Sequence, residues 1–125
     1  MLSMIEEKHD GLWLGQLRRG VADRCVLALL AHREWYGYDL AKALAQARLI
    51  AGEGTIYPLL ARLRREKLVT TVWRESGEGP PRRYYALTPE GRAELAQFRL
   101  QWRQFTSSVE SLLYEEGSEP DARFH

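Results

Sequence analysis

Hydrophobic residues recur every three or four positions in the first half of the chain, which predicts helices. A first helix is expected over about residues 14–32, and a turn at Gly37 separates it from a second helix over about residues 38–47. The apolar stripe of the first helix contains Leu17, Val21, Leu27 and Leu30. Because an amphipathic helix buries its apolar stripe, we expect most of these side chains in the core.

A third helix, predicted over about residues 55–67, carries its apolar and polar residues on opposite faces. The buried stripe follows the i, i+3, i+4, i+7 pattern, with Ile56, Leu59, Leu60 and Leu63. The opposite face is formed by Thr55, Pro58, Arg62 and Arg65. Pro58 is compatible with the helix because it lies in the first turn, where its missing N–H needs no partner.

Two strand-like segments follow the third helix. Residues 69–76 and 82–87 are rich in Val, Thr, Trp and Tyr, and the sequence Gly-Glu-Gly-Pro-Pro between them predicts a turn. Thr88 and Pro89 then mark the start of a long helix over about residues 89–114, with Thr88 as its N-cap.

A short helix followed directly by a basic hairpin is typical of a winged helix-turn-helix, in which the helix enters the major groove and the hairpin reaches the neighbouring backbone. We therefore expect a mostly α-helical fold with a small β-wing. The predicted organisation is an N-terminal extension (1–13), a DNA-binding domain (14–87), a dimerisation helix (88–116) and a flexible tail (117–125).

The long helix carries a heptad seam. Its apolar residues are spaced 3, 4, 3, 4, 3, and they are Leu95, Phe98, Trp102, Phe105, Val109 and Leu112. Such a seam packs against another helix. We expect the partner to be the same helix or the first helix of a second subunit, which makes the protein a homodimer. The alternative is an intramolecular seam against the first helix.

Three large rings, Phe98, Trp102 and Phe105, occupy successive layers of this seam. Rings of this size can hold the helices apart and leave an apolar gap, in which Trp102 stacks on a planar aromatic ligand. In the alternative interpretation, the rings fill a dimer core and no ligand binds.

The charge distribution supports the winged helix-turn-helix interpretation. The chain has 125 residues, which favours one domain, and its formal net charge is only +1. Residues 54–87 nevertheless carry seven basic residues against three acids, whereas the segment after Val109 is acidic. This asymmetry suits a protein that presents one basic face to phosphate groups.

Several classes of protein are excluded by what the sequence lacks. No apolar run reaches the roughly 18 residues of a membrane-spanning helix, and the N-terminus does not resemble a secretory signal, so we expect a cytoplasmic protein. The single cysteine, Cys25, lies in an apolar helix and is expected to be a packed thiol. No spacing of His9, His32 or His125 suggests a metal site, and no nucleophile or phosphate-loop motif occurs, so we expect no metal, no cofactor and no enzyme activity.

Three motifs resemble those of the PadR family of transcriptional regulators. They are Tyr36-Gly37-Tyr38-Asp39-Leu40, the segment from Gly54-Thr55-Ile56-Tyr57-Pro58 to Leu63, and the segment from Arg82-Arg83-Tyr84-Tyr85 to Gly91. The resemblance covers about residues 17–113 and implies a homodimeric winged-helix repressor. It also implies release from DNA by a small aromatic effector, and the single long C-terminal helix is similar to the shorter branch of the family.

The DNA-binding candidates are the exposed residues of the third helix and the cations of the wing. They are Thr55, Tyr57, Pro58, Arg62, Arg65, Lys67, Arg74, Arg82 and Arg83. Arg62 is suited to a bidentate contact with guanine, and Arg82 and Arg83 to the DNA backbone or minor groove. A two-fold dimer predicts a pseudopalindromic double-stranded operator. The rival interpretations are a winged-helix protein-interaction module and a DNA-binding protein without an effector.

Overall fold

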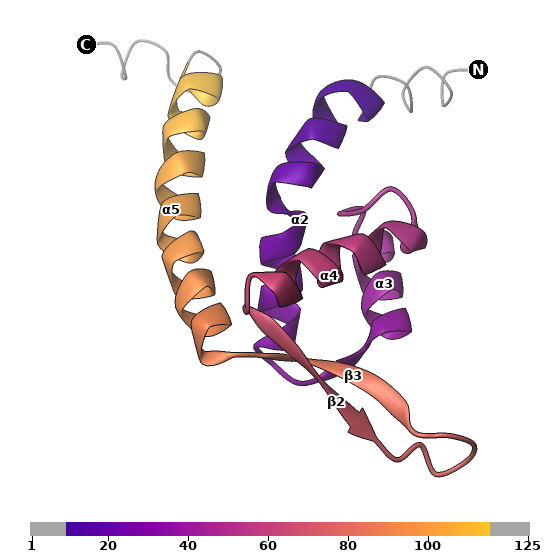
Figure 1. Cartoon of the computed structure of the whole chain (residues 1–125). Coiled ribbons are helices and arrows are strands. Elements are labelled where there is room, and N and C mark those ends of the chain that lie inside the picture. Colours follow the sequence, from indigo (N-terminus) through magenta and orange to yellow (C-terminus); the bar gives the residue numbers. More distant parts are fainter. Residues whose placement is uncertain (1–9, 116–125) are drawn as a thin grey trace, which may run out of the picture.

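A computed structural model describes residues 10–115 of the chain (Figure 1). Three helices pack together, a three-stranded sheet projects from them, and a long helix returns along one side. The elements are η1 (Asp10–Leu14), α2 (Gly15–Leu30), β1 (Trp35–Tyr36), α3 (Gly37–Gln46), η2 (Glu53–Thr55), α4 (Ile56–Arg65), β2 (Val69–Arg74), β3 (Arg82–Leu87) and α5 (Pro89–Tyr114). This architecture confirms the predicted mostly α-helical fold with a small β-wing.

The core lies where α2, α3 and α4 meet, next to the base of the sheet. Its largest fully buried side chains are Val26, Leu27, Leu40, Leu44, Ile56, Leu60 and Leu63. The stripe predicted for the third helix is therefore buried, except that Leu59 is only half-buried. Burial of this stripe fixes which face of α4 remains available to a partner.

The sheet is antiparallel, with the strand order β1-β3-β2. In the wing, Val69 of β2 pairs with Leu87 of β3, and the register continues to Arg74 opposite Arg82. Strand β1 was not predicted, because its two residues precede the turn at Gly37 and are too few to show an alternating pattern. Its Trp35 pairs with Tyr85, which connects the α2–α3 turn to the base of the wing.

Helix α5 begins and ends where the sequence predicts. The hydroxyl oxygen of Thr88 accepts a hydrogen bond from the Gly91 N–H at 2.9 Å, which is the expected N-cap. The Thr88 N–H also donates to the Leu68 carbonyl at 3.1 Å. Thr88 therefore joins the start of α5 to the segment between α4 and β2.

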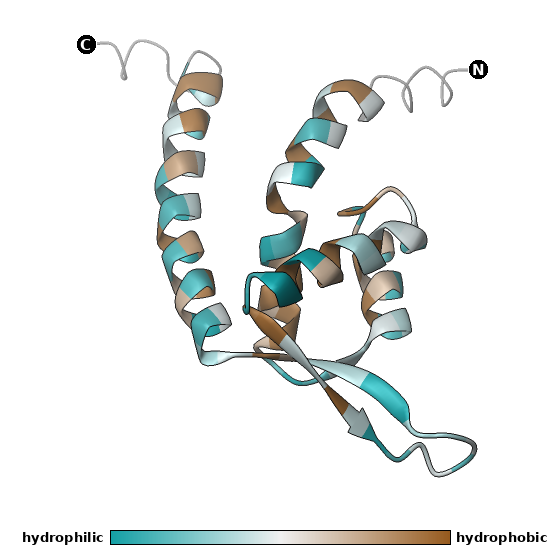
Figure 2. Cartoon of the chain, in the orientation of Figure 1, coloured by the Kyte–Doolittle hydropathy of each residue, from teal (hydrophilic) through white to brown (hydrophobic). Residues whose placement is uncertain are grey.

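The N-terminal half of α2 corrects one expectation. Leu17 is 42% exposed and Val21 is only half-buried, so of the predicted stripe only Leu27 and Leu30 are buried. The cause is that α2 and α5 separate toward their upper ends in Figure 1 and rise above α3 and α4. Figure 2 shows that hydrophobic residues continue along these projecting parts.

The two ends of the chain are not part of this description. Most of the predicted N-terminal extension (1–13) and all of the predicted tail (117–125) lie outside the described residues. Within residues 10–115, no helix has the length and hydropathy required to cross a membrane.

Candidate nucleic-acid interface

Helix α4 presents a polar surface opposite its buried stripe. Thr55, Tyr57, Pro58 and Arg65 are all exposed, as the helical pattern predicts. Three leucine and isoleucine side chains on the reverse face are fully buried, so α4 cannot rotate to withdraw this surface. The exposed face therefore projects from a rigid support.

Both ends of α4 are fixed by local contacts. Before the helix, the Thr55 hydroxyl donates to the Gly52 carbonyl at 2.8 Å. After it, Lys67 adopts a left-handed conformation with φ of 65°, and the Leu68 N–H donates to the Leu63 carbonyl at 3.0 Å. This is the hydrogen-bond pattern of a helix C-cap, and it leaves the Lys67 side chain exposed where the wing begins.

The aromatic ring of Tyr57 lies over the start of α3. A Cβ atom at Gly37 would stand 3.4 Å from the Tyr57 ring and 3.3 Å from the Tyr85 ring. Gly37 therefore allows α4 and the wing to approach the same point on α3. This close approach explains why the aromatic-Gly-Tyr sequence lies at this turn.

Arg62 does not lie on the fully exposed face where the sequence placed it. Its side chain is on the flank of α4, and its Nη1 donates to Asp23 Oδ2 of α2 at 3.2 Å. The helical pattern shows which residues share a face, but it does not reveal a buried acid on a neighbouring helix. The Arg62 side chain nevertheless remains 41% exposed, so the guanidinium group is accessible from solvent.

Asp23 is the only buried charged residue of the described chain. Besides Arg62, its Oδ2 accepts a hydrogen bond from Arg24 Nη1 at 2.8 Å. The other amino group of Arg24 donates to Glu94 on α5. A continuous set of ion pairs, here called the Asp23 network, therefore links α4 through α2 to α5.

The wing carries Arg82 and Arg83 on opposite faces, because successive residues of a strand alternate. The Arg82 guanidinium lies 4.8 Å from the centroid of the Tyr36 ring, and the Arg83 guanidinium lies 6.0 Å from that of Tyr85. Arg83 is on the face that also carries the buried Tyr85, which is the face turned toward the helices. Trp73 lies opposite Arg83 in β2 and is 67% exposed.

Arg74, the remaining wing candidate, is held by Glu34. Its Nε and Nη2 donate to the two carboxylate oxygens of Glu34 at 2.8 and 2.7 Å. The hydrogen bond and charge of Arg74 lower the pKa of the Glu34 carboxyl. The pair ties the wing to the turn after α2, and Arg74 must leave it to contact DNA.

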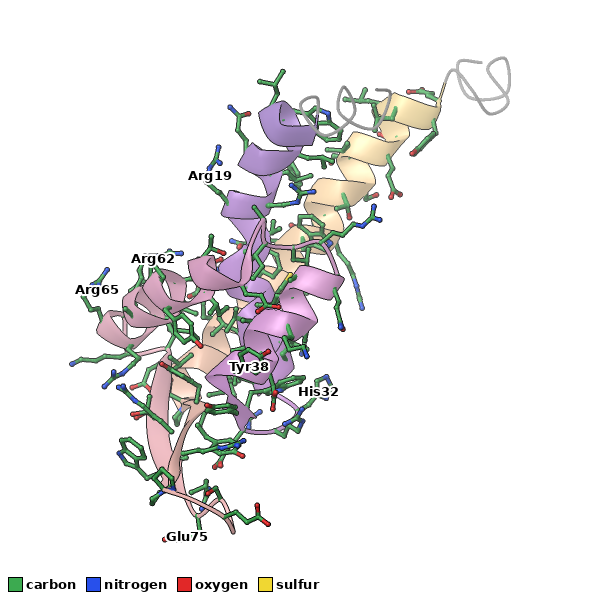
Figure 3. All side chains as sticks on the ribbon, turned by 90° about the vertical axis from the view of Figure 1, so that its right-hand side faces the viewer. Arg19, His32, Tyr38, Arg62, Arg65 and Glu75 are labelled. Atoms are coloured by element: carbon green, nitrogen blue, oxygen red, sulfur yellow. The ribbon has the colours of Figure 1, made fainter. Side chains whose placement is uncertain are left out.

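A basic surface beside α4 was missed by the sequence interpretation. Figure 3 shows Arg19, Arg62 and Arg65 pointing to the same side of the molecule. Arg18, Arg19 and Arg62 line a cavity of about 420 Å³ between α2 and the start of α4, and no acid is among its described lining residues. The adjacent arginines in the first helix were the available signal, but the spacing of one helix does not reveal its proximity to another.

The aromatic residues of α5 line a second hollow, between α5 and α2. The ring centroids of Phe98 and Trp102 are 5.7 Å apart, and those of Trp102 and Phe105 are 6.4 Å apart. Phe98 and Trp102 line a cavity of about 450 Å³ together with Cys25, and Phe105 lines an adjoining one. Burial, and then the nearby Asp23 charge, raise the pKa of the Cys25 thiol.

The heptad seam is divided between two environments. Leu95 is only 3% exposed and belongs to the core of its own chain, so its assignment to an intersubunit seam is corrected. Of the later seam residues, Phe98 and Val109 are half-buried, whereas Phe105 is 59% and Leu112 75% exposed. The predicted alternative, an intramolecular seam against the first helix, therefore describes the first part of α5, where Leu95 is buried and α2 and α5 are in contact, but not the exposed Leu112.

Among the described residues, no group of three or more His, Cys, Asp or Glu side chains is placed to hold a metal ion. The arrangement instead combines an exposed helix, a basic hairpin and a basic flank. These are the parts that a winged helix-turn-helix uses to contact double-stranded DNA.

Comparison with known proteins points in the same direction. Residues 26–97 match the family described as the transcriptional regulator PadR-like family. A PadR-like transcriptional regulator from Bacillus cereus is 36% identical, with a TM-score of 0.71, over 78% of this chain and 96% of that chain. A PadR family transcriptional regulator from Eggerthella lenta is 34% identical, with a TM-score of 0.73, over 88% of this chain and 96% of that chain. An uncharacterised protein of Lysinibacillus sphaericus is 25% identical over 81% of this chain and 94% of its own length.

Proposed function

Because the chain belongs to the PadR-like family of transcriptional regulators, we propose that it is a homodimeric repressor of the cytoplasm that a small aromatic effector releases from a pseudopalindromic operator. That it is a DNA-binding transcription regulator follows from the family itself. The repressor activity, the dimer, the effector and the contacting residues are the proposal.

The observation that carries the proposal is the position of α4. Its exposed face lies between two basic surfaces, the wing on one side and Arg18 and Arg19 on the other. We place α4 in the major groove, where Thr55, Tyr57, Pro58 and Arg65 face the DNA. Arg62 reads a guanine after it leaves Asp23.

Phosphate contacts hold α4 in this position. Lys67 and Arg83 contact the DNA phosphates on the wing side, and Arg19 contacts them on the α2 side. Arg74 and Arg82 are secondary, because Arg74 is paired with Glu34 and Arg82 lies on the other face of the wing. Each phosphate contact releases counterions, so binding should weaken as the salt concentration rises.

The dimer is supported by apolar surface that one subunit leaves uncovered. In η1 and the first turn of α2, Leu12, Trp13 and Leu17 are exposed, and toward the end of α5 so are Phe105 and Leu112. Monomeric proteins rarely expose a contiguous apolar surface of this kind. A second copy that packs its α5 against these residues would cover both surfaces, and Val109 lies within the same seam.

The effector site is supported by the cavity beside Trp102. Its lining is largely apolar apart from Arg18 and Arg48, and every lining residue comes from the same subunit. A planar aromatic molecule can stack on Trp102 there beside Phe98, and Phe105 borders it from the adjoining cavity. Because α2 and α5 also carry the dimer surface, a ligand between them would change the distance between the α4 helices of the two subunits. Ligand binding and DNA binding would then be coupled.

The test is binding to a fluorescent duplex taken from the DNA upstream of the chain's own gene, with a shuffled duplex of equal length as the control. We expect tight, salt-sensitive binding to the first and weaker binding to the second. Arg62→Ala should lower affinity for the first duplex more than for the second. Arg33→Ala is the matched control, since Arg33 is exposed and its neighbour His32 lies on the opposite side from Arg62 in Figure 3.

Two outcomes would favour the rival functions. Equal affinity for both duplexes would indicate an architectural DNA-binding protein. No binding to either duplex by a correctly folded dimer would favour a protein-interaction module.

A further inference from the structure

In the Asp23 network, a buried carboxylate pairs with the guanidinium group of Arg62. Asp23 is buried, and its Oδ2 serves both Arg62 at 3.2 Å and Arg24 at 2.8 Å. Its Oδ1 is also buried and has no hydrogen-bond partner among residues 10–115. The Asp23 carboxylate therefore accepts fewer hydrogen bonds than a buried charge requires, and it attracts any free guanidinium group nearby.

Asp23 holds Arg62 through Nη1 alone, so a bidentate guanine contact that uses Nη1 competes with Asp23. The contact of Arg62 with Asp23 is a single hydrogen bond at the long end of the normal range, whereas a guanine edge offers two acceptors. A single phosphate oxygen offers no such advantage over Asp23. Arg62 should therefore leave Asp23 for a guanine and stay with Asp23 when the protein lies on DNA of other sequence.

Removal of Arg62 does not leave Asp23 without a counterion, because Arg24 remains. Arg24, however, is shared with Glu94 of α5. While Nη2 of Arg24 is bound to Glu94, Arg24 can donate to Asp23 only through Nη1, and Asp23 remains paired with Arg62 as well. If α5 moved Glu94 away, Arg24 could serve both oxygens of Asp23 and Arg62 would be free.

We propose that Asp23 is an internal competitor of DNA for Arg62, and that Glu94 on α5 sets the strength of this competition through Arg24. The inference rests on the proposed DNA-binding function and extends it. Asp23 and Glu94 are positioning residues that need not touch DNA. Through them the position of α5 would govern the availability of a base-reading arginine.

The experiment compares full-length wild type, Asp23→Asn and Glu94→Gln for binding to the upstream duplex and to the shuffled duplex at several salt concentrations. We expect Asp23→Asn to bind the upstream duplex about two- to fivefold more tightly, as expected when a partly exposed ion pair is removed. On the shuffled duplex, the freed Arg62 gains a phosphate, so the slope of log K against log salt should steepen by about 0.9. A role confined to stability would not change this slope.

Glu94→Gln tests the link to α5 without altering the core, because the Glu94 side chain is partly exposed. It should also strengthen binding, by less than Asp23→Asn. The matched control is Glu90→Gln, which removes an exposed acid from the same helix but lies outside the network. Glu90→Gln reports the general effect of one negative charge fewer.

The decisive comparison repeats these changes in an Arg62→Ala background. The gains from Asp23→Asn and Glu94→Gln should disappear there, because the competed group is absent. Gains that persist without Arg62, or that equal those of Glu90→Gln, would overturn the inference.

Should Asp23→Asn fail to fold, the comparison of Glu94→Gln with Glu90→Gln decides on its own. If wild type binds the upstream duplex and neither variant differs from it, the inference fails while the proposed function stands; if wild type binds no DNA, the proposed function fails first.

Discussion

Gly91, in the first turn of α5, packs directly against the backbone of Leu68. A Cβ atom at Gly91 would stand 2.2 Å from the Leu68 carbonyl oxygen and 2.5 Å from the Leu87 side chain. Because that carbonyl also accepts the Thr88 N–H, it cannot move without loss of the N-cap arrangement. We expect Gly91→Ala to lower the free energy of unfolding by about 1–3 kcal/mol, the usual range for overpacking, as measured by urea denaturation.

Gly52→Ala is the matched control for Gly91→Ala. Gly52 has extended backbone angles, and a Cβ atom there would meet nothing within 4 Å. The same substitution at Gly52 should leave the unfolding midpoint nearly unchanged or raise it slightly. Equal effects at the two positions would contradict the close packing of α5 on Leu68.

The two wing arginines should differ in their contribution to DNA binding, although the sequence treats them as a pair. Arg83 shares its face of the wing with Tyr85, which approaches Tyr57 of α4 across Gly37, whereas Arg82 faces the other way. Arg83→Ala should weaken binding to any duplex and reduce the slope of log K against log salt by about 0.9. Arg82→Ala should have a smaller effect, and a larger loss in Arg82→Ala would show that the other face of the wing meets the DNA.

Local patterns predicted the fold because the elements are specified locally. The apolar stripe of α4 and the Thr88-Pro89 start of α5 lie within single elements, and each occurs where it was expected. The pairing of Arg62 with Asp23 could not be read in this way. The two residues are 39 positions apart, and their contact depends on how α4 crosses α2.

Burial was predicted less well than secondary structure for a related reason. A heptad spacing indicates that a helix has an apolar stripe but does not say where its partner begins and ends. Leu95 meets the partner within its own chain, and Leu112 does not. The divergence of α2 and α5, which separates these two cases, is a property of the tertiary structure (Figure 1).

The ion pair of Glu34 with Arg74 predicts a defined pH dependence. Arg74 lowers the pKa of the Glu34 carboxyl, so the pair stabilises the folded state above the unfolded pKa of about 4.3 and loses this contribution as the pH falls through the folded value. The stability difference between wild type and Glu34→Gln should therefore be constant from pH 8 to pH 5 and shrink below about pH 4. An NMR titration should also find a higher Glu34 midpoint in Arg74→Gln, and an unchanged midpoint would show that the pair does not persist in solution.

Cys25 offers a chemical probe of the cavity beside Trp102. Its raised pKa lowers the thiolate fraction at neutral pH, so alkylation by iodoacetamide should be slower than that of a free thiol and should still rise with pH where a free thiol has levelled off. A planar aromatic ligand that quenches Trp102 fluorescence should slow the reaction further, because Cys25 and Trp102 line the same cavity. Trp102→Ala should abolish this protection, and protection that survives in the variant would place the ligand elsewhere.

The dimer can be tested with two exposed leucines of α5, one on the heptad seam and one off it. Leu112 belongs to the heptad seam and is 75% exposed, whereas Leu100 lies off the seam and is 61% exposed. A charge at Leu112 would have to be buried in the proposed interface without a partner, so Leu112→Asp should shift the protein to a monomer at micromolar concentration in analytical ultracentrifugation. Leu100→Asp should remain a dimer and retain its DNA affinity. Loss of DNA binding only in Leu112→Asp would connect dimerisation with operator recognition, and a dimer that tolerates Leu112→Asp would require a different interface.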